Sequence, residues 1–418
     1  MLHPCVSVKL QPVKTRAPHR FRVQLLAITF GRLIVNTSIR MTYPFLPAIA
    51  RGLGVPLVSV AQLVALRSFA GFLSPLFSPL SERFGRRLLL VLSMVAFSLG
   101  CLVVFLWPAY WPLGVTLVIT GVAKVVYDPT MQSYLGDVVV YEKRGKAIAI
   151  TEFSWAGALL VGAPVIGLVI ERQGWHAPFF WLAVLGLGSA VLLWRLLPPA
   201  RVHATRAADL RAVLHVMRGH SVIWAVALYV LLAMIAQELL LIVYGDWMEQ
   251  SYGLDLTNLG LAAAVIGGAE VFGELTAGWS VDRFGKRRVV IGLGLLLAGV
   301  YFLLPFTSIS LAAALATLFI FFFLFEATFV GSMPLMTEVV PTARSVVLSV
   351  AFASAGLGRM VGALLGPLIW QQFGLRGNTF VGALMTLLSI LVLARWIHEP
   401  QRETSTAATM APGDDAPR

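Results

Sequence analysis

The chain has 418 residues, of which 58% are hydrophobic and 12% charged, and its formal net charge is +12. An ordinary soluble domain carries about 25% charged residues, so the composition excludes that class. A helix needs about 20 mostly apolar residues to span a bilayer, and uncharged runs approaching or reaching this length occupy residues 88–107, 289–306, 309–325 and 379–394. Because these runs are continuously apolar and do not alternate like barrel strands, we predict an all-α polytopic membrane protein.

Twelve membrane-spanning helices are expected along the chain, separated where proline, glycine and charged residues cluster. In chain order they cover residues 23–49, 57–80, 88–107, 113–136, 147–170, 177–197, 221–245, 257–280, 289–307, 309–335, 346–370 and 378–397.

The orientation of these spans follows from the basic residues in the loops. With the amino terminus in the cytoplasm, fifteen Lys and Arg fall in inner loops, and only Arg51, Arg172 and Arg376 fall in outer loops. Cytoplasmic loops carry the excess of Lys and Arg, so we expect a multi-pass protein of the cell membrane with both termini inside. The net charge is then explained by this bias and by a basic arm facing anionic lipid, and no nucleic-acid partner is expected.

A charged decapeptide occurs twice, 200 positions apart. Residues 81–90 read SERFGRRLLL and residues 281–290 read VDRFGKRRVV, each between the second and third spans of its half. The positive-inside bias accounts for the basic residues, but not for the order acid, Arg, aromatic, Gly or for its return at the same place. Arg144 and Arg344 form a second pair 200 positions apart, each shortly after an acidic residue.

The repeated loop resembles the signature loop of the major facilitator superfamily, and the resemblance extends over residues 22–398. The second copy matches the family pattern at Gly278, Asp282, Arg283, Gly285 and Lys286. The first copy departs from it, with Ser78 in place of glycine and Glu82 in place of aspartate.

The resemblance implies two six-helix bundles that rock around a central site. The chain then divides into a cytoplasmic basic tail (1–21), an amino-terminal bundle (22–197), a cytoplasmic linker (198–220), a carboxy-terminal bundle (221–398) and a disordered cytoplasmic tail (399–418). The resemblance also implies a cytoplasmic gate whose contacts are formed when the site faces outward and broken when the site faces inward. Its candidate residues are Glu82, Arg83, Arg144, Asp282, Arg283 and Arg344.

Eleven ionisable residues lie within the predicted spans. They are Arg32, Arg40, Arg67, Lys124, Asp128, Glu152, Glu238, Glu270, Glu274, Glu326 and Arg359. Exposed to lipid, they would cost on the order of 30 kcal/mol together, at about 2.5–3.5 kcal/mol each. We therefore expect them to face one another or a water-filled cavity, with a basic wall from the first half and an acidic wall from the second.

Spacing selects the residues expected to line this cavity. Arg32, Asn36, Arg40 and Tyr43 recur at intervals of four, four and three, which places them on one helix face. Lys124 and Asp128 are one turn apart, either as a pair that hides both charges or as a pair that a substrate or proton opens. The candidate substrate and coupling residues are Arg32, Asn36, Arg40, Tyr43, Arg67, Lys124, Asp128, Glu238, Glu270 and Glu326.

Some of the carboxylates suggest proton coupling. Glu270 and Glu274 are one turn apart, and two buried carboxylates this close disfavour joint ionisation. One of them is expected to hold a proton, as a proton carrier requires, and the alternative is a structural hydrogen bond. Glu152 is expected to support Arg144 in the gate, and Arg359 to neutralise a carboxylate of the second half.

A glycine-rich stretch suggests the direction of transport. Gly157, Gly162, Pro164 and Gly167 resemble the antiporter motif of efflux-type facilitators, although Ala163 interrupts the match. Ordinary helix packing is the alternative explanation.

No nucleotide-binding loop, H-E-x-x-H or G-x-S-x-G motif occurs, and no histidine lies in the middle of a span, so neither an enzyme, a cofactor nor a metal is expected. The sequence instead predicts a secondary transporter that exports a small organic molecule in exchange for protons. Uptake of an organic anion and a non-transporting receptor of the same fold are the alternatives. Partners are the substrate, protons and membrane lipids, and the family implies a monomer.

Overall fold

The computed structural model describes residues 18–72, 84–199 and 216–398. These residues form helices and connecting turns, with no strand among them. The helices, in chain order, are α1 (Pro18–Arg40), α2 (Leu46–Leu53), α3 (Leu57–Phe72), α5 (Arg86–Leu106), α6 (Tyr110–Val138), α7 (Tyr141–Gly157), the π-helical turn η1 (Ala158–Gly162), α8 (Ala163–Gln173), α9 (Ala177–Leu196), α11 (Ser221–Leu241), α12 (Tyr244–Tyr252), α13 (Leu256–Phe284), α14 (Lys286–Thr307), α15 (Leu311–Glu338), the 3₁₀ turn η2 (Pro341–Ala343) and α16 (Arg344–Trp396).

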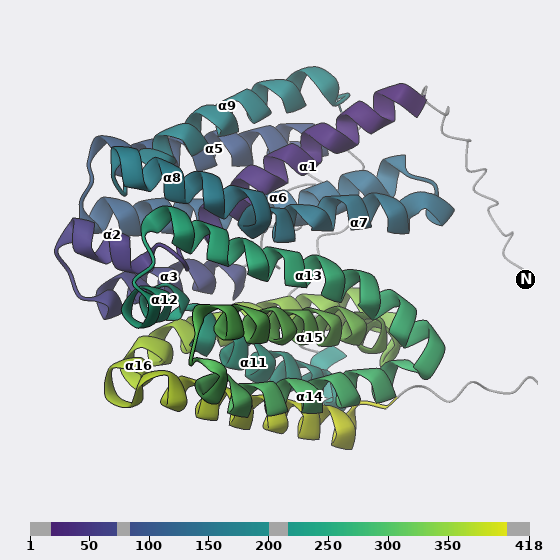
Figure 1. The fold of residues 1–418 in the computed structure, drawn as a ribbon. Coiled ribbons are helices and arrows are strands. Elements are labelled where there is room, and N and C mark those ends of the chain that lie inside the picture. Colours follow the sequence, from purple (N-terminus) through teal and green to yellow (C-terminus); the bar gives the residue numbers. More distant parts are fainter. Residues whose placement is uncertain (1–17, 73–83, 200–215, 399–418) are drawn as a thin grey trace, which may run out of the picture.

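The helices gather into two groups that follow the order of the chain (Figure 1). In the first half, α5 packs on α6 and α9, and α1 lies against α6, α7 and α9. In the second half, α11 packs along α16, and α15 along α13 and α14. The two groups meet where α13 packs on η1 and α8, and where α3 packs on α16.

The helices confirm the predicted fold class. By length and composition, nine helices of the described residues are apolar enough to cross a membrane, or ten if α2 and α3, bent by 116°, count as one span. Helix α1, which carries Arg32 and Arg40, is not among them, and α16 runs through two predicted spans with a break at Gly374. The count of twelve therefore stays a prediction.

The repeat seen in the sequence is also present in the backbone. Within the described residues, positive φ angles occur only at six glycines, which form three pairs about 200 positions apart. They are Gly54 and Gly253, Gly85 and Gly285, and Gly174 and Gly374. Gly85 and Gly285 have nearly the same conformation, φ 85° with ψ 143° and φ 88° with ψ 138°. Since a side chain is rarely tolerated at positive φ, each half needs glycine at the same three turns.

Close packing explains the glycines of the predicted antiporter-like stretch. A Cβ on Gly162 would lie 2.7 Å from Thr37 Oγ1 of α1, and one on Gly167 would lie 2.4 Å from the carbonyl oxygen of Leu256. On the facing helix, a Cβ on Gly260 would meet the carbonyl oxygen of Ala163 at 2.5 Å. Small residues let helix backbones approach closely, so helix packing is sufficient to explain Gly162 and Gly167, and the direction of transport stays a prediction.

The break in α16 yields a test of the backbone repeat. Gly374 has φ 60° and ψ −155°, and no atom would lie within 4 Å of a Cβ placed on it. We expect Gly374→Ala to lower the free energy of unfolding by about 1–3 kcal/mol, because this backbone region is essentially restricted to glycine. The measurement is reversible denaturation in mixed detergent micelles.

Gly299→Ala in α14 is the matched control, because it also adds a Cβ in open space but at a residue within a regular helix. It is expected to be neutral or stabilising by up to about 1 kcal/mol. Equal effects of the two substitutions would contradict the explanation from backbone conformation.

Candidate functional site

A buried ion pair joins the two halves at the centre of the molecule. Helix α1 ends at Arg40, whose guanidinium forms a two-pronged contact with Glu270 in the middle of α13, with Nη2 to Oε1 at 2.6 Å and Nη1 to Oε2 as the second contact. The side chains are 0% and 1% exposed. Arg40 Nη1 also donates to the carbonyl oxygen of Trp155 at 3.1 Å.

The energetics of this pair differ from those of a surface salt bridge. Taking two charges out of water costs several kcal/mol per ion, and their attraction repays this only with close geometry. Removing one partner leaves the other charge buried without compensation. The contact between Arg40 and Glu270 therefore adds little net stability by itself, but neutralising one of its charges leaves the other buried without compensation and strongly disfavours this contact between the halves.

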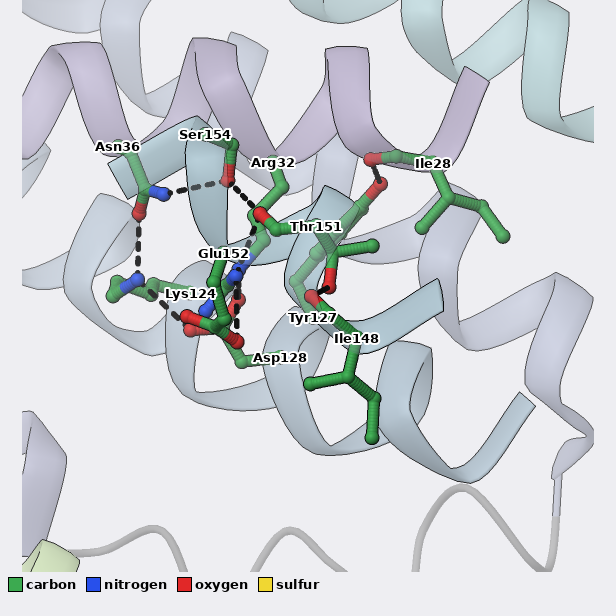
Figure 2. A network of polar contacts seen from close by, with 10 residues as sticks. All are labelled: Ile28, Arg32, Asn36, Lys124, Tyr127, Asp128, Ile148, Thr151, Glu152 and Ser154. Carbon is green, nitrogen blue, oxygen red and sulfur yellow. Dashed lines mark hydrogen bonds and ion pairs between the residues drawn. The ribbon is translucent and has the colours of Figure 1, made fainter. Parts of the chain in front are cut away.

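Figure 2 shows a second polar network, contained within the first half. Arg32 of α1 pairs with Asp128 of α6, Nε to Oδ1 at 3.1 Å, and with Glu152 of α7, Nη1 to Oε1 at 2.9 Å. Lys124 Nζ lies 2.8 Å from Asp128 Oδ2. Two cations are thus compensated by two carboxylates of the same half.

Asn36 ties this network to its neighbours (Figure 2). Lys124 Nζ donates to Asn36 Oδ1 at 2.6 Å, and Asn36 Nδ2 donates to Ser154 Oγ at 3.1 Å. The one-turn pair of Lys124 and Asp128 therefore forms, and it also bridges to α1. Glu152, expected near Arg144, lies against Arg32 instead. These contacts connect α1, α6 and α7 into one unit with its charges balanced.

A third cluster links the end of α1 and the turn after it to α3 and α11. Tyr43 Oη donates to Glu238 Oε2 at 3.3 Å, and the Arg67 guanidinium carbon lies 5.7 Å from the centre of the Tyr43 ring. Arg67 Nη1 donates to the Ile39 carbonyl oxygen and to Thr42 Oγ1, each at 3.0 Å. Glu238 is fully buried, and its other oxygen has no hydrogen-bond partner among the described residues. The cluster is a second polar link between the halves.

Two carboxylates beside the central pair are not neutralised. Glu326 of α15 is 9% exposed and Glu274 of α13 is half-buried, and neither carboxylate has a hydrogen bond or ion pair within the described chain. A Cβ on Gly273 would lie 2.9 Å from Glu326 Cβ, so α13 and α15 approach closely here. Glu326 is thus a nearly buried carboxylate next to the Arg40–Glu270 pair with no cation bound to it.

Cations from both halves lie close to the indole ring of Trp155. Arg40, Lys124 and Arg359 lie 4.4, 5.2 and 5.4 Å from its centroid. Cations are attracted to the face of an aromatic ring. Sequence reasoning overlooked Trp155, although its position was a usable signal. Tryptophans of membrane proteins usually lie at the interfaces, and this one lies within a predicted span, shortly after the polar residues Thr151, Glu152 and Ser154.

The candidate gate residues are only partly described. Glu82 and Arg83 lie outside the described residues. Asp282, Arg283 and Arg344 are exposed, and no ion pair joins them within the described residues. Arg144 donates to the carbonyl oxygens of Val139 at 2.9 Å and Gly136 at 2.5 Å.

One end of the molecule carries the repeated loops and is called the loop end. There, ion pairs between described residues form within each half at equivalent positions. Arg86 Nε lies 3.0 Å from Asp137 Oδ2, and Lys286 Nζ lies 2.5 Å from Glu338 Oε1. Each pair fastens the helix after the repeated loop to the end of the fourth or tenth predicted span. Neither pair reaches across to the other half.

At the opposite end, polar contacts do cross between the halves. Arg51 Nη1 lies 2.5 Å from Glu249 Oε2, linking α2 to α12. Glu171 of α8 accepts a hydrogen bond from the Thr257 backbone N–H at 3.1 Å and another from its hydroxyl. In the described residues, hydrogen bonds between the halves occur here and at the centre, but not at the end that carries the repeated loops.

The arrangement suits charge-linked movement of the two halves. Within the described residues, no group of three or more His, Cys, Asp and Glu side chains is placed to hold a metal ion. The chemistry available at the centre is that of carboxylates and cations, which bind charged groups or exchange protons.

The chain resembles known transporters over most of its length. The family model of the Major Facilitator Superfamily matches residues 28–244 and 226–414. The uncharacterised MFS-type transporter YbcL of Bacillus subtilis is 24% identical over 374 residues, covering 89% of this chain and 94% of its own. Tetracycline resistance protein class C of Escherichia coli is 26% identical over 281 residues, covering 64% and 69%. The structure of a D-xylose–proton symporter matches with a TM-score of 0.75 at 18% identity, covering 91% and 98%.

The central pair gives a test by substitution. We expect Glu270→Gln to lower the free energy of unfolding by about 3–5 kcal/mol, because it leaves Arg40 buried and uncompensated. Replacing both residues by methionine removes both charges and is expected to recover most of that loss. The measurement is the free energy of unfolding of the wild type, Glu270→Gln and the double methionine variant, by denaturation in mixed micelles.

Arg51→Gln is the control, because it breaks another contact between the halves but at an arginine whose side chain is 61% exposed. Its expected cost is at most about 1 kcal/mol. A double variant as unstable as Glu270→Gln alone would show that the cost does not come from an uncompensated charge.

Proposed function

The chain belongs to the Major Facilitator Superfamily and is a membrane transporter, not an enzyme, and from that premise we propose that it moves a small organic molecule in exchange for protons. The observation that carries the proposal is the buried Arg40–Glu270 pair, which joins the halves next to the unpaired carboxylate of Glu326. A charged contact between moving parts, beside a group that takes up a proton, is what coupling requires.

In the proposed cycle, residues 22–197 and 221–398 move as two bodies around the central site. The contacts Arg51–Glu249 and Glu171–Thr257 close the outer end in the form described here, while the loop end has no described polar contact across the halves. This supports an inward-facing form. The gate residues Glu82, Arg83, Arg144, Asp282, Arg283 and Arg344 would meet across the halves in the outward-facing form.

Protonation supplies the link between movement and ions. Arg40 has one carboxylate bound, Glu270, and Glu326 lies near it as an alternative partner. Glu274 lies near Glu270 and Arg32. A proton arriving at Glu326 removes a negative charge near Arg40, and a proton leaving restores it. The equilibrium between the two forms of the transporter then depends on which carboxylates are charged, because a ligand shifts a conformational equilibrium only through its different affinity for the two states.

The remaining candidate residues take separate roles in this proposal. Arg32, Asn36, Lys124 and Asp128 hold α1, α6 and α7 together as one wall of the cavity. Arg67, Tyr43 and Glu238 form the link on the other side. The protein is proposed to act as a monomer in the cell membrane, with both termini and the repeated loops in the cytoplasm.

Export is the proposed direction. Its support is the positive-inside bias, which predicts that the end with the repeated loops faces the cytoplasm, and the likeness to a relative named for tetracycline resistance. A second candidate, proton-driven uptake of an organic anion, is favoured by Arg359. This arginine lies over Trp155 and has no hydrogen bond or ion pair in the described part of the chain, so it is placed to receive a carboxylate.

Proton exchange is testable before the substrate is known. Inside-out vesicles would carry a pH-sensitive dye and an acid interior, and a panel of cations, drugs and organic acids would be added outside. We expect at least one compound to dissipate the gradient with the wild type, and Glu326→Gln to abolish that response because its amide takes up no proton.

Asp255→Asn is the matched control, since Asp255 is an exposed carboxylate that caps the start of α13 and takes part in no described contact between the halves. Asparagine caps a helix as well as aspartate does, so this variant should retain the response. A gradient that no compound dissipates would overturn export by proton exchange. Uptake of labelled organic acids into right-side-out vesicles with an alkaline interior, abolished by Arg359→Gln, would then establish the anion importer. Ligand binding without any flux would establish a receptor.

A further inference from the structure

A groove on the outside of the second half lies apart from the central charges. Its volume is about 660 Å³, within the range of about 300–1,000 Å³ that small-molecule sites occupy. The wall from α14 comprises Phe302, Pro305 and Phe306, and α16 contributes Phe373 and Phe380 among others. The floor and walls are almost entirely apolar.

The shape of the groove follows from two helix irregularities. Helix α14 ends at Thr307, just beyond Phe306, and α16 leaves the helical conformation at Gly374. Since α14 begins at the loop end, these features lie toward the opposite end. The Phe306 and Phe373 side chains are 71% and 67% exposed in the isolated chain, so in a bilayer the groove opens toward the lipid.

In a bilayer, hydrocarbon chains fill an apolar groove of this kind. Contacts with hydrocarbon alone do not make the groove prefer one lipid over another. Lipid tails are as apolar as the side chains that line it, so there is no hydrophobic gain in exchanging one acyl chain for another. Any selectivity has to come from a polar group at the edge of the groove.

Arg376 is the charged residue among those that line the groove. It follows the break at Gly374 by two residues and is exposed, and its guanidinium has no hydrogen bond or ion pair within the described residues. Guanidinium binds phosphate oxygens in a two-pronged geometry. By contrast Arg51, at the same end, is already bound to Glu249.

We propose that the groove is a binding site for an anionic phospholipid, with the headgroup phosphate on Arg376 and an acyl chain lying along Phe302, Phe306 and Phe380. The apolar walls accept the chain, and the unpaired cation at the edge selects the charge of the headgroup. The site is separate from the transport site, and it does not depend on the direction or coupling of transport.

Native mass spectrometry of the detergent-solubilised full chain tests the proposal, with phosphatidylglycerol, phosphatidylcholine and oleate as probes. We expect the wild type to bind phosphatidylglycerol more tightly than phosphatidylcholine. Arg376→Gln should weaken phosphatidylglycerol binding about fivefold, which corresponds to one basic residue near an anionic headgroup. Arg376→Lys should retain most of the preference.

Arg172→Gln is the control, because Arg172 is an exposed arginine at the same end of the first half that does not line the groove. It should bind phosphatidylglycerol as the wild type does. Val381→Trp, which fills the groove from its wall and leaves Arg376 in place, should reduce binding of both phospholipids.

Equal losses for Arg376→Gln and Arg172→Gln would overturn the proposal in favour of diffuse surface charge. A preference for oleate would overturn the phospholipid assignment, and unchanged binding by Val381→Trp would overturn the position of the acyl chain. Each variant changes an exposed or partly exposed side chain, and its melting temperature in detergent shows whether it is folded.

Discussion

The rule that a charge buried away from water must be compensated governs the centre of this molecule. Arg40 ends α1 with its guanidinium fully buried, and Glu270 of α13 compensates it from the other half. This contact is one of several that join the two halves, and Trp155 and Glu326 lie in the same region. Removing either charge makes the arrangement unfavourable, and in the proposed cycle a proton or an ionic substrate weakens this contact.

The two halves use their charges differently. In the first half, Arg32 and Lys124 are balanced by Asp128 and Glu152, so that network keeps its helices together without help from the second half. In the second half, Glu326 is left without a bound cation among the described residues. A charge-balanced network in the first half therefore lies opposite a carboxylate of the second half that no described cation neutralises, and in the proposed cycle this carboxylate takes up the proton.

The internal repeat affects the scaffold and not the site. Glycines with positive φ recur in three pairs, and the ion pairs Arg86–Asp137 and Lys286–Glu338 occupy equivalent positions. The central residues are not repeated, since leucine stands 200 positions after Arg40 and alanine stands 200 positions before Glu270. The repeated turns thus provide two similar bundles, and the unrepeated charges between them make the site asymmetric.

The sequence by itself determined the fold class, the repeat and the set of ionisable residues that lipid could not surround, because composition, apolar run length and spacing are local properties. It also predicted the pairing of Lys124 with Asp128, which depends only on one helical turn. The partners of Arg32 and Arg40 are 96 to 230 positions away, and no local pattern distinguishes Glu270 from Glu326 as the partner of Arg40. Only the packing of α1 against α7 and η1, and of these elements against α13, decided that choice, because which of several buried carboxylates meets a cation depends on the distance between helices.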